Sequence, residues 1–238
     1  MNVIPAIDLY DGHAVQLRGG NPDQRIWDSD EPVEEARRWW ELGADALHIV
    51  DLDRALSSGR DNDDLVHDIV DESPVPVEIG GGLRGARPIR DLLDPHPTAK
   101  AIVATRAWKD RPWLDHICEE FPGRILVGLE LKHGTIAVEG WTERTKLTLE
   151  EGLHRLDGQD LGGVLLTDID REGKMMGPNI DTAETAVEEL DVPIIASGGI
   201  STIEHLQDLE AAGVDAAVVG TALYTGDLDF EDAQEALA

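Results

Sequence analysis

Eight short apolar runs alternate with eight amphipathic stretches along this sequence, and the alternation restricts the chain to few folds. The runs are rich in β-branched residues and cover 3–8, 46–52, 75–80, 101–105, 124–131, 163–169, 193–199 and 216–222. The amphipathic stretches have helical spacing and cover 32–43, 62–73, 86–94, 113–121, 148–156, 181–190, 202–213 and 230–237. Apolar strands separated by helices indicate a parallel sheet with both faces covered. Eight such units predict a single closed (β/α)8 barrel (TIM barrel), with an open doubly wound sheet as the rival interpretation.

The two halves of the chain resemble each other. Four pairs of segments match in the same order, three of them at an offset of 116 or 117 residues. The pairs are HIVDLDR with LLTDIDR, IGGGLR with SGGIS, VATRA with VGTAL, and PAIDLYDG with GLELKHG. The repeat predicts one domain over 1–238, made of half-barrels at about 1–122 and 123–238. Every matched polar element follows an apolar strand, so a barrel would gather these elements at its carboxyl-terminal face.

The composition is strongly acidic, with 49 Asp and Glu residues against 20 Lys and Arg and a formal net charge of −29. A field of this sign repels nucleic acid, so we expect no nucleic-acid partner. The acidity is typical of a solvated surface that keeps a protein soluble in high salt. A small anionic substrate would need local positive groups to overcome the overall field.

Cysteine content and hydropathy bear on the compartment. The single cysteine, Cys118, excludes an internal disulfide and fits a reducing compartment. The opening MNVIPAIDLY lacks the features of a signal peptide, and no run of 18 apolar residues occurs. We therefore expect a cytoplasmic protein, without a membrane partner and monomeric.

Two glycine-rich turns follow strands in matching places. Gly80–Gly82 has a partner one unit later at Ala104–Thr105, and Gly198–Gly199 has one at Gly220–Thr221. Glycine lets backbone N–H groups approach an anion closely, and threonine adds a hydroxyl donor. A lone turn of this kind can be a tight turn and nothing more. The duplicated combination predicts two phosphate sites on opposite sides of the barrel mouth, and hence a substrate with a phosphate at each end.

Carboxylates stand at matching strand ends in the two halves. Glu130 interrupts the apolar run ILVGLELKHG, and Asp8 occupies the equivalent place in PAIDLYDG. Two carboxyl groups across a barrel mouth suit paired general acid and base chemistry, although strand-end acids can also simply cap loops. We interpret Asp51 as a hydrogen-bonding scaffold residue. Thr167 and Glu172 could orient the substrate or a proton-transfer group.

Other chemistry-bearing residues have plainer interpretations. The eight histidines are scattered without an HxxxH or HxH pair, so no metal site is predicted. His133 is expected in an exposed loop, and Cys118 to pack in the core. Trp39 and Trp40 are expected to pack on the barrel. Trp141 lies in a long loop after the fifth strand, where it could stack on a planar heterocycle or anchor the loop.

Nearly the full length of the sequence resembles a known family. The segments that carry the resemblance are IPAIDLYDGHAVQLRGG, HIVDLD, EIGGGLR, GW at 140–141, LTDIDREG, GPN at 177–179, ASGGIS and VGTALYTG. They resemble the phosphoribosylformimino-5-aminoimidazole carboxamide ribotide isomerases of histidine biosynthesis. The opening IPAIDLYDG distinguishes the chain from the related cyclase, which usually opens more like IPCLDVKDG.

The resemblance implies a half-barrel-duplicated (β/α)8 fold and an Amadori rearrangement of a bisphosphorylated aminoaldose (ProFAR) to an aminoketose (PRFAR). No metal or cofactor is implied. Asp8 would be the general base, Glu130 the general acid, and Thr167 and Glu172 would contact the reacting sugar. The residues matching the phosphate sites are Gly82 and Thr105 for one, and Gly173, Gly199, Gly220 and Thr221 for the other. Arg18 and Trp141 are further substrate-binding candidates.

The sequence departs from the family pattern at four of these places. The family usually has Asp where this chain has Glu130 and Glu172, often glycine at Ala104 and a small residue at Arg54. The added methylene can move carboxylate oxygens by roughly 1 Å, which can cost about 10²-fold in rate. We favour a backbone adjustment that preserves the isomerase. A different substrate and a non-catalytic sugar-phosphate-binding paralogue are the alternatives.

A further alternative is an isomerase that also accepts phosphoribosylanthranilate. That substrate has one phosphate and a carboxylate, so it needs a basic group near the second anion site. Arg18, Arg84 and Arg144 are the candidates for such a group.

Overall fold

Eight parallel strands close into a barrel, as the sequence predicts. The computed structural model describes residues 1–171 and 176–237. The barrel strands are β1 (Asn2–Tyr10), β4 (Leu47–Asp51), β5 (Val77–Gly80), β6 (Lys100–Val103), β7 (Ile125–Lys132), β10 (Gly163–Asp168), β11 (Ile194–Ser197) and β12 (Ala216–Val219). Each pairs with its neighbour in chain order, and β1 pairs with β12 to close the ring. The doubly wound alternative is therefore excluded.

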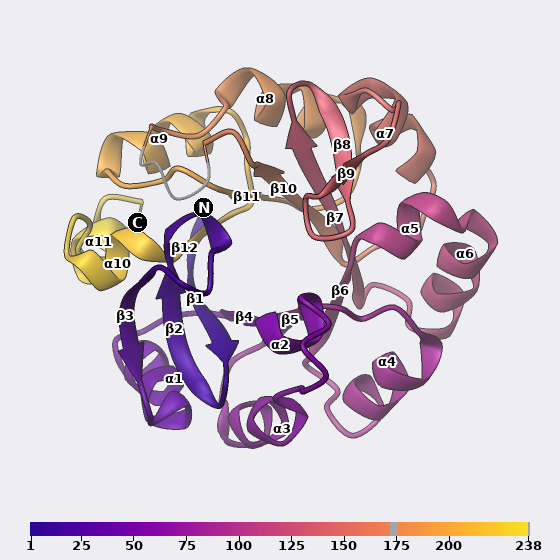
Figure 1. Cartoon of the computed structure of the whole chain (residues 1–238). Helices are drawn as coiled ribbons and strands as arrows, with labels where there is room; N and C mark the ends of the chain where they lie inside the picture. Colours follow the sequence, from indigo (N-terminus) through magenta and orange to yellow (C-terminus); the bar gives the residue numbers. More distant parts are fainter. Residues whose placement is uncertain (172–175, 238) are drawn as a thin grey trace.

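The eight predicted helices form a ring around the barrel (Figure 1). They are α1 (Pro32–Glu41), α3 (Asp63–Glu72), α4 (Ala86–Leu93), α6 (Arg111–Glu120), α7 (Leu149–Leu156), α8 (Ile180–Glu189), α9 (Ile203–Ala211) and α11 (Phe230–Glu235). Local sequence explains several of their starts. Proline opens the first turn of α1 and of α6, where its missing N–H costs nothing. Thr148 and Glu151 form a reciprocal capping box at the start of α7.

Short elements at the mouth were not predicted. They are the strands β2 (His13–Leu17), β3 (Arg25–Ser29), β8 (Thr135–Val138) and β9 (Glu143–Arg144), and the short helices η1 (Arg18–Gly20), α2 (Leu52–Ala55), α5 (Thr105–Lys109) and α10 (Thr221–Thr225). β1 and β7 both extend beyond the barrel and pair antiparallel with β2 and β8 respectively. Each half of the chain therefore begins with a long strand followed by a small antiparallel extension over the rim.

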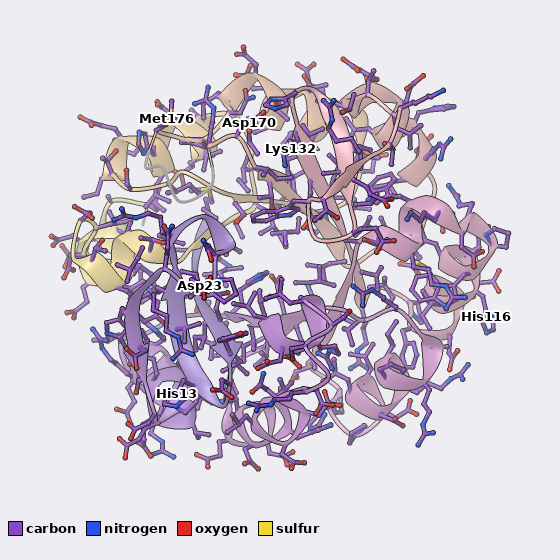
Figure 2. The ribbon with its side chains drawn as sticks, in the orientation of Figure 1. His13, Asp23, His116, Lys132, Asp170 and Met176 are labelled. Carbon is purple, nitrogen blue, oxygen red and sulfur yellow. The ribbon has the colours of Figure 1, made fainter. Side chains whose placement is uncertain are left out.

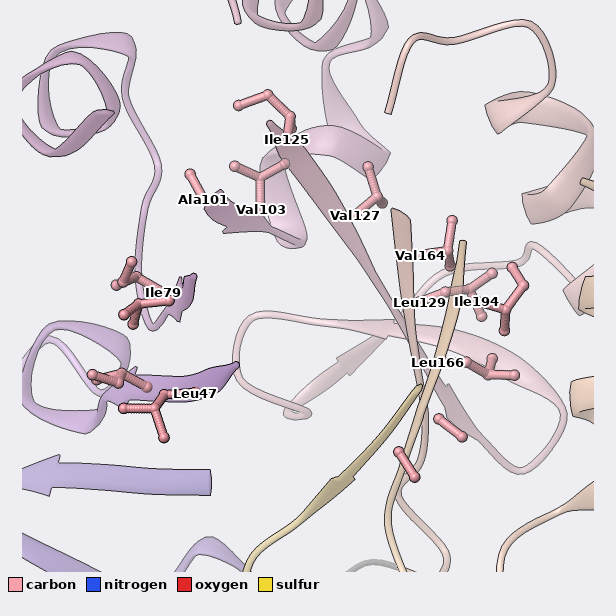
Figure 3. Packing of buried hydrophobic residues seen from close by; sticks show 14 of the residues in the cluster. Leu47, Ile79, Ala101, Val103, Ile125, Val127, Leu129, Val164, Leu166 and Ile194 are labelled. Atoms are coloured by element: carbon pink, nitrogen blue, oxygen red, sulfur yellow. The ribbon is translucent and has the colours of Figure 1, made fainter. Parts of the chain in front are cut away.

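The apolar core has two layers, because each barrel strand is buried on both faces. One layer lies between the strands and the helices, and Figure 3 shows part of it, with Leu47, Ile79, Val127 and Ile194 among its members. The other fills the barrel interior. Its members are Ile4, Ala6, Ile102, Leu126, Leu165, Ile195, Ala216 and Val218.

The interior layer ends where polar side chains begin. Side chains alternate along a strand, so residues two apart share a face. On β1, Ala6 belongs to the interior layer and Asp8 is the next residue on the same face. On β10, Leu165 is followed in the same way by Thr167. The apolar interior layer therefore forms the floor of a polar mouth at the carboxyl ends of the strands.

Trp39 and Trp40 of α1 pack into the apolar layer between the helices and the barrel, as predicted. Trp39 on α1 is 1% exposed and donates a hydrogen bond from Nε1 to the Tyr224 hydroxyl at 3.0 Å. Its ring meets Tyr224 and Phe230 edge-on, with centroids 5.5 and 5.6 Å apart. Trp40 is partly buried against the same core, and Cys118 is buried in the packing of α6. Trp39 thus joins the first helix to the last two. Within the described residues, no helix is long and apolar enough to cross a membrane.

Truncation of Trp39 is expected to weaken this closure. Trp39→Ala should lower the free energy of unfolding by about 3–5 kcal/mol, since it removes a fully buried aromatic side chain and leaves a cavity. Trp40→Ala, one position along the same helix, is the matched control and should cost clearly less. Denaturant unfolding of both variants measures the difference. Equal losses would contradict the role given to Trp39.

Candidate active site

One cavity opens at the carboxyl-terminal face of the barrel, and most of the predicted site residues line it. It has about 1050 Å³ of empty space, open solvent included. Seven predicted residues contribute to its wall: Asp8, Glu130, Trp141, Thr167, Gly199, Gly220 and Thr221. They come from β1, β7, the loop after β8, β10, the turn after β11 and the segment after β12. Residues more than 200 positions apart in sequence therefore share this cavity.

Asp8 stands on the floor of the mouth, on the inward face of β1. Burial raises the pKa of Asp8 to about 6, while the nearby charge of His48 acts in the opposite direction. His48 lies on the adjacent strand and lines the same cavity. A carboxyl group with a pKa near 6 is ionised at neutral pH and still basic enough to accept a proton.

Glu130 stands on β7, the first strand of the second half. Burial raises the pKa of Glu130 above its usual range, and a hydrogen bond from the Trp141 side chain works against that rise. Thr167 lies directly opposite Glu130 in the register of β7 and β10, and is 6% exposed. The structure thus brings a carboxyl group that tends to hold its proton beside a buried hydroxyl.

Trp141 reaches the cavity on a strained segment between β8 and β9. Three consecutive residues, Glu139, Gly140 and Trp141, have positive φ angles of 53°, 59° and 69°. Such angles cost free energy in residues other than glycine and persist only where surrounding contacts hold them. Lys132 Nζ donates to the Trp141 carbonyl at 3.0 Å, and a Cβ on Gly20 would lie 3.6 Å from the indole. The indole therefore lies between Glu130 and the segment that contains Gly20.

The two glycine-rich turns have matching backbones. Gly81 and Gly82 have φ angles of 93° and 68°, and Gly198 and Gly199 have 95° and 77°. A side chain at either turn would strike backbone: a Cβ on Gly82 would lie 2.6 Å from the Arg54 carbonyl oxygen, and one on Gly199 would lie 2.8 Å from that of Gly177. Successive backbone N–H groups in such conformations make concavities suited to anions.

The threonines that follow these turns begin short helices. Thr221 is the first residue of α10, lines the cavity and donates to Gln16 Oε1 at 3.4 Å. Thr105 is the first residue of α5, and its hydroxyl oxygen accepts a hydrogen bond from the Glu139 N–H at 2.8 Å. Gly82 and Thr105 do not line the central cavity. The first predicted phosphate site therefore lies outside it, beside the loop that contains Trp141.

Asp51 is a scaffold residue, in agreement with its interpretation from sequence. It is fully buried, and its carboxylate accepts hydrogen bonds from the Arg54 N–H, the Asn62 N–H and Asn62 Nδ2, at 3.1, 3.0 and 2.8 Å. In the second half, Asp168 accepts from Asn179 Nδ2 at 2.9 Å. The asparagine pair has the same offset of 117 residues as the aspartate pair.

Several residues were missed by the sequence analysis. The asparagine pair could have been found, since Asn62 and Asn179 obey the repeat. Gln16, His48 and Ser197 line the cavity and were not proposed. Gln16 and His48 are buried polar residues on the strands β2 and β4. Gln16 lies outside the repeated motifs, and His48 is matched in the second half by the apolar Leu165. Only their place in the closed barrel identifies them.

Other predicted residues lie away from the cavity or outside the described part of the chain. Arg18 is exposed at the start of η1, where its N–H donates to the Gln24 carbonyl, and it does not line the cavity. Glu172 and Gly173 fall outside the described residues. His133 is exposed, as expected, and its N–H donates to Asp170 at 2.7 Å. Figure 2 labels Asp170, which follows β10, and Lys132, which ends the neighbouring strand β7.

The described residues contain no group of three His, Cys, Asp or Glu side chains arranged to hold a metal ion. Burial raises the pKa of the Cys118 thiol to about 11, so that side chain is a poor nucleophile as well as a buried one. The groups lining the mouth that can move protons include the carboxyl groups of Asp8 and Glu130 and the imidazole of His48.

Comparison with known proteins agrees with this geometry. The model of a family described as "Histidine biosynthesis protein" matches residues 2–229. The chain belongs to this family. A relative from Persephonella marina is 39% identical over 236 residues, covering 98% of each chain. Relatives from Halobacterium salinarum and Natronomonas pharaonis are both 40% identical, covering 99% and 97% of this chain and 96% of each relative. All three are named 1-(5-phosphoribosyl)-5-((5-phosphoribosylamino)methylideneamino) imidazole-4-carboxamide isomerase.

The raised pKa of Asp8 can be tested through the pH dependence of the protein's stability. A carboxyl group whose pKa is higher in the folded than in the unfolded state stabilises the fold only while protonated, so its contribution is lost as the pH rises through about 6. Asp8→Asn should therefore raise the melting temperature relative to the original protein at pH 8. The gain should shrink as the pH falls through 6 and disappear below about pH 4.

Thermal melts across this pH range measure the effect. Asp45→Asn, which removes the same charge from an exposed turn, is the matched control. A gain of the same size for both variants at every pH would show that Asp8 is not perturbed in the fold.

Proposed function

We propose that this protein is the isomerase of histidine biosynthesis that converts the bisphosphorylated aminoaldose ProFAR to the aminoketose PRFAR. The observation that carries the proposal is the presence of Asp8 and Glu130 in one cavity, each with a raised pKa, on the first strand of each half. Aldose–ketose rearrangement needs one group to deliver a proton and another to remove one. The names of the relatives support the same substrate for this chain.

In the first step, the Glu130 carboxyl group protonates the ring oxygen of the ribose. The bond between C1 and that oxygen breaks, the ring opens, and the exocyclic nitrogen forms a protonated Schiff base with C1. Burial raises the pKa of Glu130 and so favours the protonated form that this delivery requires. Thr167, its direct neighbour on β10, would hold the sugar hydroxyls during ring opening.

In the second step, the Asp8 carboxylate removes the proton from C2. The electron pair of that bond neutralises the iminium group and gives an enolamine, which becomes the ketose when C1 gains a proton and the C2 hydroxyl loses one. Asp8 is ionised at neutral pH but has a pKa near 6, which suits a general base.

Two anion sites would hold the substrate at its ends. Gly199, Gly220 and Thr221 line the cavity and would bind the phosphate of the reacting ribose, together with Gly173. Gly82 and Thr105 would bind the other phosphate beyond the cavity wall. The Trp141 indole, held beside Glu130, would lie against the imidazole between them. Arg18 would bind the substrate at the rim of the mouth.

The remaining expectations belong to the same proposal. We infer one domain of two half-barrels, over about 1–122 and 123–238, and the matched aspartate, asparagine and glycine positions support this division. We further propose a cytoplasmic enzyme that works as a monomer on a small molecule without metal or organic cofactor. Glu172 would contact the reacting sugar.

Removal of the base is expected to abolish turnover. Asp8→Asn should lower kcat by about 10³-fold or more while substrate binding stays largely intact, since proton removal by a positioned base typically contributes 10²–10⁴-fold. Turnover of the bisphosphorylated aminoaldose, measured by absorbance from low to molar salt, tests this. Normal turnover by the variant would remove Asp8 from the mechanism. Absence of turnover by the folded original protein would favour the binding paralogue.

The pH dependence should report both carboxyl groups. We expect kcat/KM to fall on the acidic side as Asp8 gains a proton near pH 6, and on the alkaline side as Glu130 loses its proton. Glu130→Gln should remove the alkaline limb along with most of the activity, whereas Glu130→Asp should retain activity within about 10²-fold, because it keeps the proton and shifts it by roughly 1 Å. An unchanged profile for Glu130→Gln would assign the acid to another group.

A further inference from the structure

Arg54 lies directly beneath the glycine-rich turn of the first phosphate site. It belongs to α2, which Asp51 caps. A Cβ on Gly82 would lie 2.6 Å from the Arg54 carbonyl oxygen and 2.8 Å from its Cγ atom. A Cβ on Gly81 would lie 2.2 Å from the Asp51 carbonyl oxygen. The turn and the arginine are therefore in van der Waals contact, with no room for another side chain between them.

The guanidinium group makes specific contacts with the turn. Arg54 Nε donates to the Gly81 carbonyl oxygen at 2.6 Å, and Nη1 donates to Asp63 Oδ1 at 2.5 Å. The side chain is 16% exposed. Its Nη2 atom is buried without a hydrogen-bond partner among the described residues. A charged donor left unmatched in this way is costly unless a ligand or solvent satisfies it.

The bond to Gly81 determines which way the next N–H points. The peptide between Gly81 and Gly82 is trans and planar, so its carbonyl and its N–H point in opposite directions. Since the Gly81 carbonyl is directed at Arg54, the Gly82 N–H is directed away from Arg54. Gly82 is the residue expected to approach a phosphate. Arg54 therefore fixes the orientation of this N–H.

The charge of Arg54 has a second effect at this place. Asp51 Oδ2 lies 3.7 Å from Arg54 Nε, and Asp63 is its other acidic partner. Without the guanidinium group, both carboxylates would remain under the turn and repel a phosphate. The nearby Arg84 is exposed and donates to Ser57 and Ala55, so solvent screens its charge more strongly.

The equivalent residue in the second half is used differently. Arg171 lies 117 residues after Arg54 and has the same 3.7 Å separation between Nε and its aspartate, Asp168. It donates to the carbonyl oxygens of Gly177 and Pro178 instead of to a turn glycine. Direct support of the glycine-rich turn by the arginine is therefore a feature of the first site.

We propose that Arg54 is a positioning and specificity-determining residue for the first anion site, where it orients the Gly82 N–H and offsets the carboxylates of Asp51 and Asp63. The inference rests on the proposed function, because the anion concerned is the phosphate at the far end of that substrate. It assigns recognition of this phosphate to a residue that does not belong to the glycine and threonine pattern.

The test combines variants with truncated substrates. Arg54→Ala, Arg54→Lys and the control Arg87→Ala are compared for dissociation constant, by calorimetry, and for KM and kcat. The ligands are the bisphosphorylated aminoaldose and its two analogues, each lacking one phosphate. Arg87 is 91% exposed on the neighbouring helix α4, paired with Asp91, so its removal changes the net charge equally without touching the turn.

Arg54→Ala should weaken binding of the bisphosphorylated compound and raise KM at least tenfold, with kcat changed less than about threefold. For the analogue that lacks the phosphate of the first site, the variant and the original protein should agree within about twofold. Arg54→Lys should recover part of the loss, since it keeps the charge but not the planar donor group. Arg87→Ala should match the original protein.

Other outcomes decide against the inference. An equal loss with both analogues would make Arg54 a general structural residue, and no loss with any ligand would remove it from the site. The calorimetric arm separates this inference from the proposed function. If the original protein binds the bisphosphorylated compound without converting it, the isomerase proposal fails and the Arg54 comparison still stands. If it binds none of the three ligands, both fail.

Discussion

Closure of the parallel barrel obliges every strand to bury both of its faces, and the rest of the structure depends on this constraint. Open sheets can leave an edge or a face to solvent, but here each side chain points either at the helical layer or into the barrel interior. Apolar residues meet the requirement at the floor. Asp8 and Glu130, at the inner rim, meet it only partly, because burial disfavours their ionised forms. The same burial that costs stability raises the pKa of both carboxyl groups.

The hydrogen bond between Trp141 and Glu130 links the rim to a strained loop. Left-handed angles at Glu139 and Trp141 are unfavourable in isolation, and the contacts with Thr105, Lys132 and the segment around Gly20 keep them. The Glu139 N–H donates a hydrogen bond to the hydroxyl oxygen of Thr105, a residue of the first predicted phosphate site. One loop therefore contacts both the candidate acid and a candidate phosphate residue.

The fold could be predicted from the sequence because the pattern of apolar strand and amphipathic helix is local and is repeated eight times. Apolar runs of strand length and helices with one apolar face specify the barrel and its ring without knowledge of any distant contact. The small extensions at the rim were missed for the opposite reason. β3 and β9 are exposed and mostly polar, and they are strands only because β2 and β8 offer backbone partners.

The residues of the candidate site could be predicted from the sequence only where the internal duplication repeats them. Asp8, Glu130 and the glycine turns stand out because each half repeats them, and Asn62 and Asn179 carry the same signal at the same offset. Gln16 and His48 carry none, since each occurs in one half only. Their presence in the cavity follows from the inward face of β2 and β4, which requires the register of strands that are far apart in the chain.

Duplication also sets the limit of this kind of inference, because matched residues of the two halves can make different contacts. The buried Asp51 and the partly buried Asp168 keep the same role as scaffolds, since both halves need a helix start held against a strand end. Arg54 and Arg171 have diverged, one contacting the glycine turn and the other the carbonyl groups of 177–178. With a net charge of −29, the protein cannot attract an anion through its overall field, so each anion site depends on its own few donors. Arg54 and Arg171, although matched in sequence, therefore place their guanidinium groups against different backbone segments on the two sides of the barrel mouth.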